Sequence, residues 1–231
     1  MSITQVQQML VDAGFNPGKV DGVWGNATRS ALATALDLAR SGRPAPPVSG
    51  ALRNAIAVDQ IIADGLQLLV PAIPATEEAR VLLLAYSGQE ADFHHRWQVF
   101  DRARPTAMGA ARGLWQFERG GAVRGVLTHA RTRTMAAVLC RMRGLPATID
   151  AVYNALHQDD LLAAAFARLN LWWHPSPLPA VGDVDGAWKL YIDAWRPGAY
   201  WNAGVTTAQR EALRAKFAGY YNIALQARKA A

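Results

Sequence analysis

The chain has 231 residues and 51% hydrophobic content, enough for one core of ordinary size with a small additional module. Its 24 basic and 18 acidic residues give a net charge of +6, which favours polyanionic partners such as nucleic acid or an acidic bacterial envelope. The basic residues form no compact block and no nucleic-acid-binding motif is evident. The sequence therefore favours the envelope and argues against nucleic acid.

The compartment is constrained by three features of the sequence. Cys140 is the only cysteine, so no intramolecular disulfide can form, and this fits synthesis in a reducing cytosol. The N-terminus lacks a basic region followed by an apolar stretch, so no Sec-type signal peptide is expected. Apolar runs such as residues 81–86 are too short to span a bilayer, and stable membrane insertion is not expected.

Residues 1–40 predict a small helical module. The first helix is indicated by apolar residues at helical spacing, namely Ile3, Val6, Leu10 and Ala13. Turn signals follow at residues 16–18 and 21–22, and Asn26 is a candidate N-cap for a second helix.

Within this module, Asp21, Gly22, Gly25 and Thr28 form an Asp-Gly-x-x-Gly-x-x-Thr pattern. The segment 14–29 that contains it closely resembles the three-helix peptidoglycan-binding domain. The resemblance implies that the module binds peptidoglycan, with candidate contacts at Asn16, Asp21, Trp24, Asn26 and Arg29. Two alternatives stay open, because Asp21 also suits the turn itself and Trp24 is typical of the core of so small a module.

Residues 41–50 are rich in proline and glycine and predict a linker between this module and a domain at 51–231. Prolines and glycines divide that domain, and no alternating pattern indicates a sizeable sheet. The predicted helices span residues 51–69, 76–90, 122–142, 148–157, 159–172, 187–195 and 206–227. The expected fold class is therefore mainly α.

Glu90 ends the helix predicted at 76–90, for which Thr76 is a candidate N-cap. Glu90 shares a helix face with Leu83 and Tyr86, a face that should be buried. Desolvation and the negative end of the helix dipole both raise the pKa of a carboxyl group. A raised pKa is what a general acid needs near neutral pH.

The segments 89–98 and 111–118, which carry Gln-Glu-Ala-Asp-Phe and Gly-Leu-Trp-Gln, resemble the lysozyme-like catalytic domain of phage endolysins. More broadly, they are similar to the lytic transglycosylase and goose-type lysozyme group, whose later Tyr-Asn motif stands here as Tyr153-Asn154. The chain departs from that pattern at Ala91, where serine is usual, and at Trp115, where methionine is usual. No glycine lies close to Tyr153, where the group usually has one.

The resemblance implies cleavage of the β-1,4 bond between N-acetylmuramic acid and N-acetylglucosamine, with Glu90 as the acid. It further implies a lytic transglycosylase in which one glutamate acts first as acid and then as base. If a second carboxylate takes part instead, the candidates are Glu118, Asp92 and Asp101.

Four residues are candidate substrate contacts. Gln116 can offer its amide to an N-acetyl group, and Trp115 can supply a flat surface for a sugar ring or pack in the core. Tyr153 can form a hydrogen bond to Glu90 or to a sugar hydroxyl, or it can be a buried helix tyrosine. Asn154, the next residue of the Tyr-Asn motif, is the fourth candidate.

Other kinds of site have less support from the sequence. Glu90 and His94 are four residues apart, but the H-E-x-x-H zinc pattern is absent, so neither a metal nor a cofactor is expected. Cys140 is predicted to be a buried small side chain. Five tryptophans of the last third are predicted to be mostly core residues: Trp172, Trp173, Trp188, Trp195 and Trp201.

The sequence thus predicts a bacteriolytic enzyme, an endolysin that is made in the host cytoplasm and acts as a monomer on periplasmic peptidoglycan after its release. Two alternatives stay open. One is a hydrolytic muramidase in which Glu118 assists, and the other is a non-catalytic wall-binding or virion structural protein.

Overall fold

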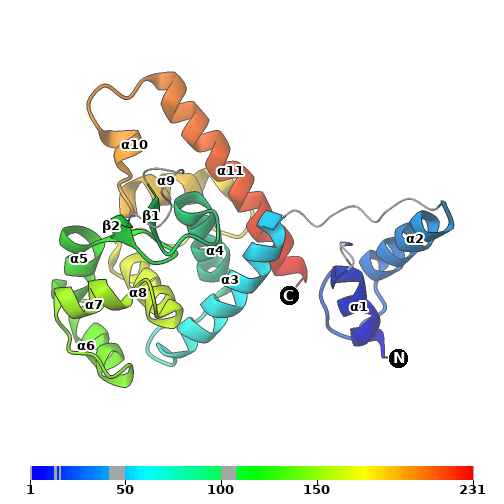
Figure 1. Ribbon diagram of the computed structural model, residues 1–231, viewed down its shortest axis with the longest axis horizontal. Helices are drawn as coiled ribbons and strands as arrows, with labels where there is room; N and C mark the ends of the chain where they lie inside the picture. The colour runs from blue at the N-terminus through cyan, green and yellow to red at the C-terminus, as the bar shows by residue number, and fades with distance from the viewer. Residues whose placement is uncertain (1, 13–14, 16, 42–49, 100–107, 231) are drawn as a thin grey trace.

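The computed structural model describes residues 2–12, 15, 17–41, 50–99 and 108–230. Over these residues the chain is mainly α-helical, as the sequence predicted (Figure 1). Asn16, Asp101 and most of the predicted linker lie outside the described residues. No helix in the described ranges is both long and apolar enough to cross a bilayer.

The N-terminal module contains α1 (Ile3–Asp12) and α2 (Asn26–Ser41), and no third helix occurs among its described residues. The prediction of Asn26 as N-cap is wrong by one residue, because Asn26 already belongs to α2. The carbonyl oxygen of Gly25 accepts the first helical hydrogen bond, from the N–H of Arg29 at 3.1 Å. Gly25 is therefore the N-cap of α2.

The rest of the chain forms a helical body with a small sheet. Its helices are α3 (Gly50–Gln67), α4 (Glu77–Ala91), α5 (Arg124–Thr128), α6 (Arg133–Met142), α7 (Ile149–Ala155), α8 (Asp160–Trp173), α9 (Val184–Ala194), α10 (Gly198–Trp201) and α11 (Thr207–Ala230). A π-helical turn, η1 (Arg119–Val123), precedes α5.

Helix α4 is the central element of this body, packed against α3, α8 and α11 (Figure 1). All side chains from Val81 to Gln89 are buried. The N-cap prediction is confirmed, because the hydroxyl of Thr76 accepts a hydrogen bond from the N–H of Ala79 at 3.3 Å. A helix that is apolar all round has to lie inside the body, and this fixes the position of Glu90 at its end.

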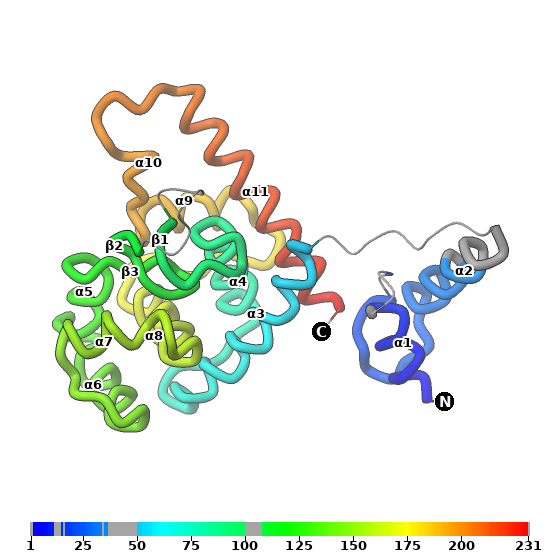
Figure 2. Tube along the Cα trace, in the orientation of Figure 1, coloured from blue at the N-terminus to red at the C-terminus, as the bar shows by residue number. Residues whose placement is uncertain are grey.

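Three short antiparallel strands lie beside the C-terminal end of α4 (Figure 2). They are β1 (Trp97–Val99), β2 (Met108–Arg112) and β3 (Phe117–Glu118), with β2 in the middle. The sheet is small, as expected, and its role is local: it carries Gln98 and Glu118 to the region of Glu90.

The prediction of one continuous helix over residues 122–142 is wrong, because the helical pattern is interrupted between α5 and α6. Thr132, which is fully buried at the break, donates its hydroxyl to the carbonyl oxygen of Val126 at 2.7 Å. A side chain that bonds to a nearby carbonyl competes with the helical pattern, and a hydrophobic periodicity does not reveal this.

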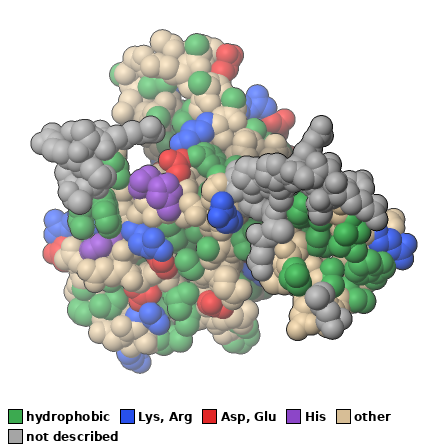
Figure 3. Space-filling model, turned by 45° about the vertical axis from the view of Figure 1, so that its right-hand side comes forward, with side chains coloured by type: hydrophobic (Ala, Val, Ile, Leu, Met, Phe, Trp, Pro, Cys, Tyr) green, Lys and Arg blue, Asp and Glu red, His purple; other side chains and the backbone are tan. Residues whose placement is uncertain are grey.

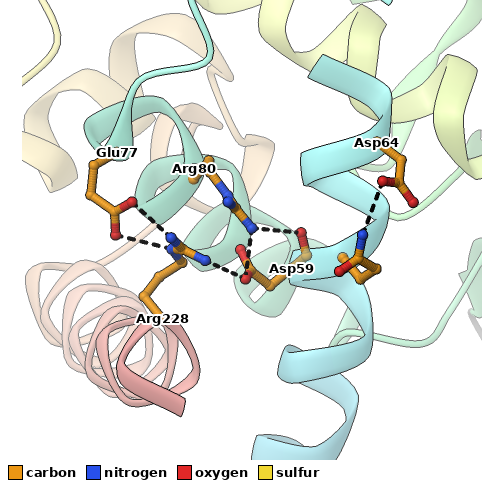
Figure 4. Close-up of polar contacts among 6 residues, drawn as sticks. Asp59, Asp64, Glu77, Arg80 and Arg228 are labelled. Atoms are coloured by element: carbon orange, nitrogen blue, oxygen red, sulfur yellow. Dashed lines mark hydrogen bonds and ion pairs between the residues drawn. The ribbon is translucent and has the colours of Figure 1, made fainter. Parts of the chain in front are cut away.

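A buried ion-pair network ties α3, α4 and α11 together (Figure 4). Asp59 is 1% exposed, and one of its oxygens, Oδ2, lies 2.9 Å from Arg80 Nη2 and 2.6 Å from Arg228 Nη1. Arg228 also pairs with Glu77, at 2.8 Å, near the start of α4. The network therefore fastens the end of the C-terminal helix to the base of the helix that carries Glu90.

We expect Asp59→Asn to lower the free energy of unfolding by about 3–5 kcal/mol, because it leaves Arg80 without its carboxylate and Arg228 with Glu77 alone. Asp64→Asn is the matched control on the same helix, since Asp64 is exposed and bonds only to Gln60 in this structure. It should change the stability by less than about 0.5 kcal/mol. Urea unfolding of the two variants measures the difference, and equal effects would contradict a stabilising role for the network.

Candidate active site

Glu90 lies in the last turn of α4, where it is partly buried and lines a cleft of about 650 Å³. The strands contribute Gln98 and Glu118 to the walls, and α9 and α11 contribute Tyr191 and Lys216. The cleft is therefore assembled from segments that lie more than one hundred residues apart in the sequence.

A second hollow, of about 500 Å³, adjoins the first and shares Glu90, Gln98 and Gln116 with it. Its other walls include His94 and His95, whose rings lie 3.8 Å apart. Glu90 therefore belongs to the wall of both recesses. This arrangement suits a long ligand that passes Glu90 and occupies both.

The strongest contact of Glu90 is with Tyr191, whose hydroxyl donates to Glu90 Oε1 at 2.6 Å. Burial raises the pKa of the Glu90 carboxyl from its ordinary value near 4.5 to about 7. The hydrogen bond from Tyr191 and the charge of Lys216 act in the opposite direction, and the charge of Glu118 adds to the rise. Glu90 is thus a carboxyl group that can give up or take a proton near neutral pH.

Lys216 approaches the site from α11. Its ammonium group donates to the carbonyl oxygen of Gln89 at 3.0 Å and lies 4.0 Å from Asp92 Oδ1. Asp92 has φ 48° and accepts a further hydrogen bond from the hydroxyl of Tyr220. Asp92 therefore helps to hold α11 against the end of α4, and it faces the second hollow rather than the larger cleft.

Gln116 lines both hollows from the turn between β2 and β3. Its side-chain nitrogen donates to the carbonyl oxygen of Gly113 at 2.9 Å, and no described residue donates to its side-chain oxygen. Gly113 has φ +73°, and a Cβ there would lie 2.7 Å from the carbonyl oxygen of Leu156. The turn thus needs glycine at 113, and it holds Gln116 with an acceptor available to the cleft.

The expectation that Trp115 contacts substrate is wrong. Its side chain is 0% exposed, and its indole N–H donates to the carbonyl oxygen of Leu83 at 2.9 Å, inside the core. The indole groups that line the cleft are Trp173 and Trp195, both partly buried. Trp195 stacks on Phe117 with ring centroids 6.0 Å apart and donates to the backbone of Trp115 at 3.2 Å.

The prediction that the last-third tryptophans are mostly core residues is also wrong. Only Trp188 among them is buried, and Trp172 and Trp201 are exposed.

Tyr153 and Asn154 do not line either hollow. The hydroxyl of Tyr153 donates to the carbonyl oxygen of Ala110 at 2.8 Å, and Asn154 is exposed on α7. Of the three roles left open for Tyr153, the bond to Glu90 does not occur, and Tyr191 makes that bond instead. No pattern in the sequence distinguishes Tyr191 from the other apolar-face residues of α9.

Glu118 is exposed on β3 and lines the larger cleft with Glu90. No group of three or more His, Cys, Asp or Glu side chains within the described ranges is arranged to hold a metal ion. The expectation of a metal-free site stays a prediction. Cys140 is free and fully buried, as predicted, and burial raises the pKa of its thiol.

In the N-terminal module, the turn after α1 is organised by Gln7, which is 1% exposed. Its side chain accepts from the N–H of Gly22 at 2.9 Å and donates to the hydroxyl of Thr28 at 3.1 Å. Asp21 accepts from the N–H of Val23 at 2.9 Å, so the motif residues Asp21 and Thr28 serve the turn. This role of Gln7 was not predicted, because a glutamine between the apolar positions of a helix usually lies at the surface.

Trp24 is 37% exposed, so the expectation that it forms the core of the module is wrong. Asn26 and Arg29 are exposed as well. These three side chains remain candidate wall contacts.

Residues 2–35 match the sequence model of a family described as a putative peptidoglycan binding domain. Neither the curated proteins nor the solved structures contain a match to the chain. The N-terminal module is thus a peptidoglycan-binding module by sequence, which supports association of the protein with the cell wall.

The raised pKa of Glu90 predicts a specific dependence of stability on pH. Between about pH 4.5 and pH 7 the folded protein keeps a proton on Glu90 that the unfolded chain has lost, so stability falls as the pH rises. Glu90→Gln removes this loss. Between pH 5 and pH 8, the free energy of unfolding of Glu90→Gln should rise by roughly 2 kcal/mol relative to that of the wild type. One pKa unit corresponds to about 1.4 kcal/mol, and the full effect of the shift is reduced because Glu90 is partly exposed.

Urea unfolding of both proteins at the two pH values measures this difference. A difference between the two proteins that does not change with pH would contradict a raised pKa.

Proposed function

We propose that this protein is a peptidoglycan glycosidase, with Glu90 as its general acid. The observation that carries the proposal is the partly buried carboxyl group of Glu90, with a pKa near 7, in the wall that two hollows of one cleft share. A peptidoglycan-binding module on the same chain supports a glycan strand as the ligand. The cleft walls fit such a ligand, since Trp173 and Trp195 offer flat apolar surfaces and Gln116 offers an acceptor for an acetamido N–H.

In the proposed reaction, the β-1,4 bond between N-acetylmuramic acid and N-acetylglucosamine lies at Glu90. The protonated carboxyl group gives its proton to the glycosidic oxygen as the C1–O4 bond breaks. In the transglycosylase version, the 6-hydroxyl of the same muramic acid then attacks C1 and returns its proton to Glu90. This version needs no second carboxylate and no water.

The hydrolytic version has a structural basis in Glu118, which shares the cleft with Glu90. An exposed carboxylate in that position can activate a water molecule that attacks C1. Its exposed position and its place on a different wall suit a base, whereas the partly buried Glu90 suits the acid.

The N-terminal module would hold the catalytic body at the wall and so raise the local concentration of bonds to cut. The cell-lytic role of an endolysin, with release from the cytoplasm to the periplasm, belongs to the same proposal.

Glu90→Gln should lower the rate of sacculus clearing by on the order of 10²–10⁴-fold, because it keeps the shape and polarity of the side chain but removes the transferable proton. Glu118→Gln is the matched variant in the same cleft, and it should lower the clearing rate less than Glu90→Gln does if no second carboxylate takes part. Both variants should still sediment with sacculi. Near wild-type clearing by a folded Glu90→Gln protein would exclude Glu90, and binding without any clearing by the wild type would favour a non-catalytic wall-binding protein.

Tyr191→Phe removes the hydrogen bond that stabilises the charged form of Glu90, so the pKa of Glu90 should rise by roughly one unit. The alkaline limb of the pH–rate profile should then move to higher pH by the same amount, because the acid stays protonated longer. Tyr86→Phe is the control: Tyr86 belongs to the same aromatic cluster, but its hydroxyl donates to the carbonyl oxygen of Ala187. An alkaline limb that moves equally in both variants would show a general packing effect.

The products distinguish the two versions of the reaction. Transglycosylation leaves 1,6-anhydro-muramic acid ends, whereas hydrolysis leaves reducing ends. We expect anhydro ends in the mass spectrum of digested peptidoglycan. Reducing ends, together with a large loss of rate in Glu118→Gln, would assign the reaction to a muramidase instead.

A further inference from the structure

Beyond the cleft, one arginine is buried without a charged partner. Arg168 lies on α8, is 3% exposed, and has no ion pair within the described chain. Its buried Nε has no hydrogen-bond partner. The guanidinium carbon Cζ lies over the ring of Trp172, 5.3 Å from its centroid.

An isolated buried charge is strongly unfavourable unless a counter-charge accompanies it. Burial lowers the pKa of Arg168 to about 10, so the group is still charged at neutral pH. By contrast, the partly buried Arg228 pairs with both Asp59 and Glu77. No described residue supplies a counter-charge to Arg168, so the group is suited to bind an anion from solution.

Arg168 lines a hollow of about 390 Å³ that is open to solvent and distinct from the cleft. Arg131 lines the same hollow, is exposed, and makes no ion pair with any described residue. No Asp or Glu contributes to the described walls of this hollow. Two guanidinium groups thus meet in one recess without a carboxylate.

The remaining polar walls are compatible with an anion. His174 is already engaged at both ring nitrogens, with Asp193 at 3.0 Å and the N–H of Ser176 at 3.2 Å, so it forms a wall and competes for no ligand. The Ser176 hydroxyl has no hydrogen-bond partner among the described residues and can donate to an acceptor. The polar side chains that line the hollow are therefore two arginines, a serine that can donate and a histidine that is already engaged.

We propose that this hollow, formed around Arg168 and Arg131, binds an oxyanion, either a phosphate group or a carboxylate. Arginine presents its N–H groups in a planar fork that matches two oxygens of such a group. The site lies on the face of α8 opposite Asn170 and Trp173, which line the cleft. Anion binding therefore goes beyond the proposed glycosidase activity and does not depend on it.

The two sources of the anion are distinguished by two probes. Inorganic phosphate represents a phosphate group, and N-acetylmuramyl-L-alanyl-D-glutamate represents the carboxylates of peptidoglycan stem peptides. The full-length protein is titrated with each probe against sodium chloride of equal ionic strength, and its thermal unfolding is followed. We expect stabilisation that rises with probe concentration, as a ligand of the folded state requires.

Arg168→Met keeps the approximate side-chain volume and removes the unpaired charge. Its stability without anion should equal or exceed that of the wild type, and its response to the probe should be lost. Arg131→Gln should weaken the affinity for the anion by at least about tenfold, because one charge-assisted hydrogen bond is lost. Arg133→Gln is the control, because Arg133 is exposed at the start of α6 and does not line the hollow.

The catalytic variant Glu90→Gln should respond as the wild type does, which separates this proposal from the proposed function. Stabilisation by phosphate alone assigns a phosphate ligand, and stabilisation by the muramyl peptide assigns a peptidoglycan carboxylate. No response to either probe beyond that to chloride, or an equal response in Arg168→Met, would overturn the proposal.

Discussion

The hydrogen bond between Tyr191 and Glu90 is the contact on which the candidate site depends. It joins the end of α4 to α9 across a sequence separation of 101 residues, at 2.6 Å. The bond works against the burial that raises the pKa of Glu90, and the net result is a carboxyl group near pKa 7 rather than one that is always protonated. A weaker opposing interaction would leave the group a poor base, and a stronger one would leave it a poor acid.

The geometry of that contact rests on the packing of α4. Gly88 lets α11 approach closely, because a Cβ at this position would lie 2.6 Å from the ring of Tyr220 and 2.5 Å from that of Phe93. Lys216, one turn before Tyr220 on α11, is thereby brought to the backbone of Gln89. The ion pairs of Asp59 fasten the far end of the same two helices. Packing along α4 and α11 thus holds both the acid and the cation that tunes it.

The sequence predicted those parts of the protein that depend on local patterns. The apolar run before Glu90 and the cap at Thr76 predicted the position of the helix, and the Gly-Leu-Trp-Gln segment from Gly113 to Gln116 predicted that Gln116 lies near Glu90. Partners that meet through tertiary packing could not be predicted in this way. Trp115 and Trp195 have the same side chain, and only the packing decides that the first bonds to Leu83 in the core while the second lines the cleft.

The same limit explains why Tyr191, and not the predicted Tyr153, bonds to Glu90. The position of Tyr153 beside Asn154 matched a short pattern, yet its hydroxyl bonds to the β2 backbone at Ala110. Tyr191 lies on a helix face that also packs against Phe217, with ring centroids 5.3 Å apart, so its periodicity indicates only a core residue. Its hydroxyl reaches Glu90 because the aromatic cluster places it at the end of α4. The buried aromatic ring holds the position, and the single polar atom at its edge makes the hydrogen bond.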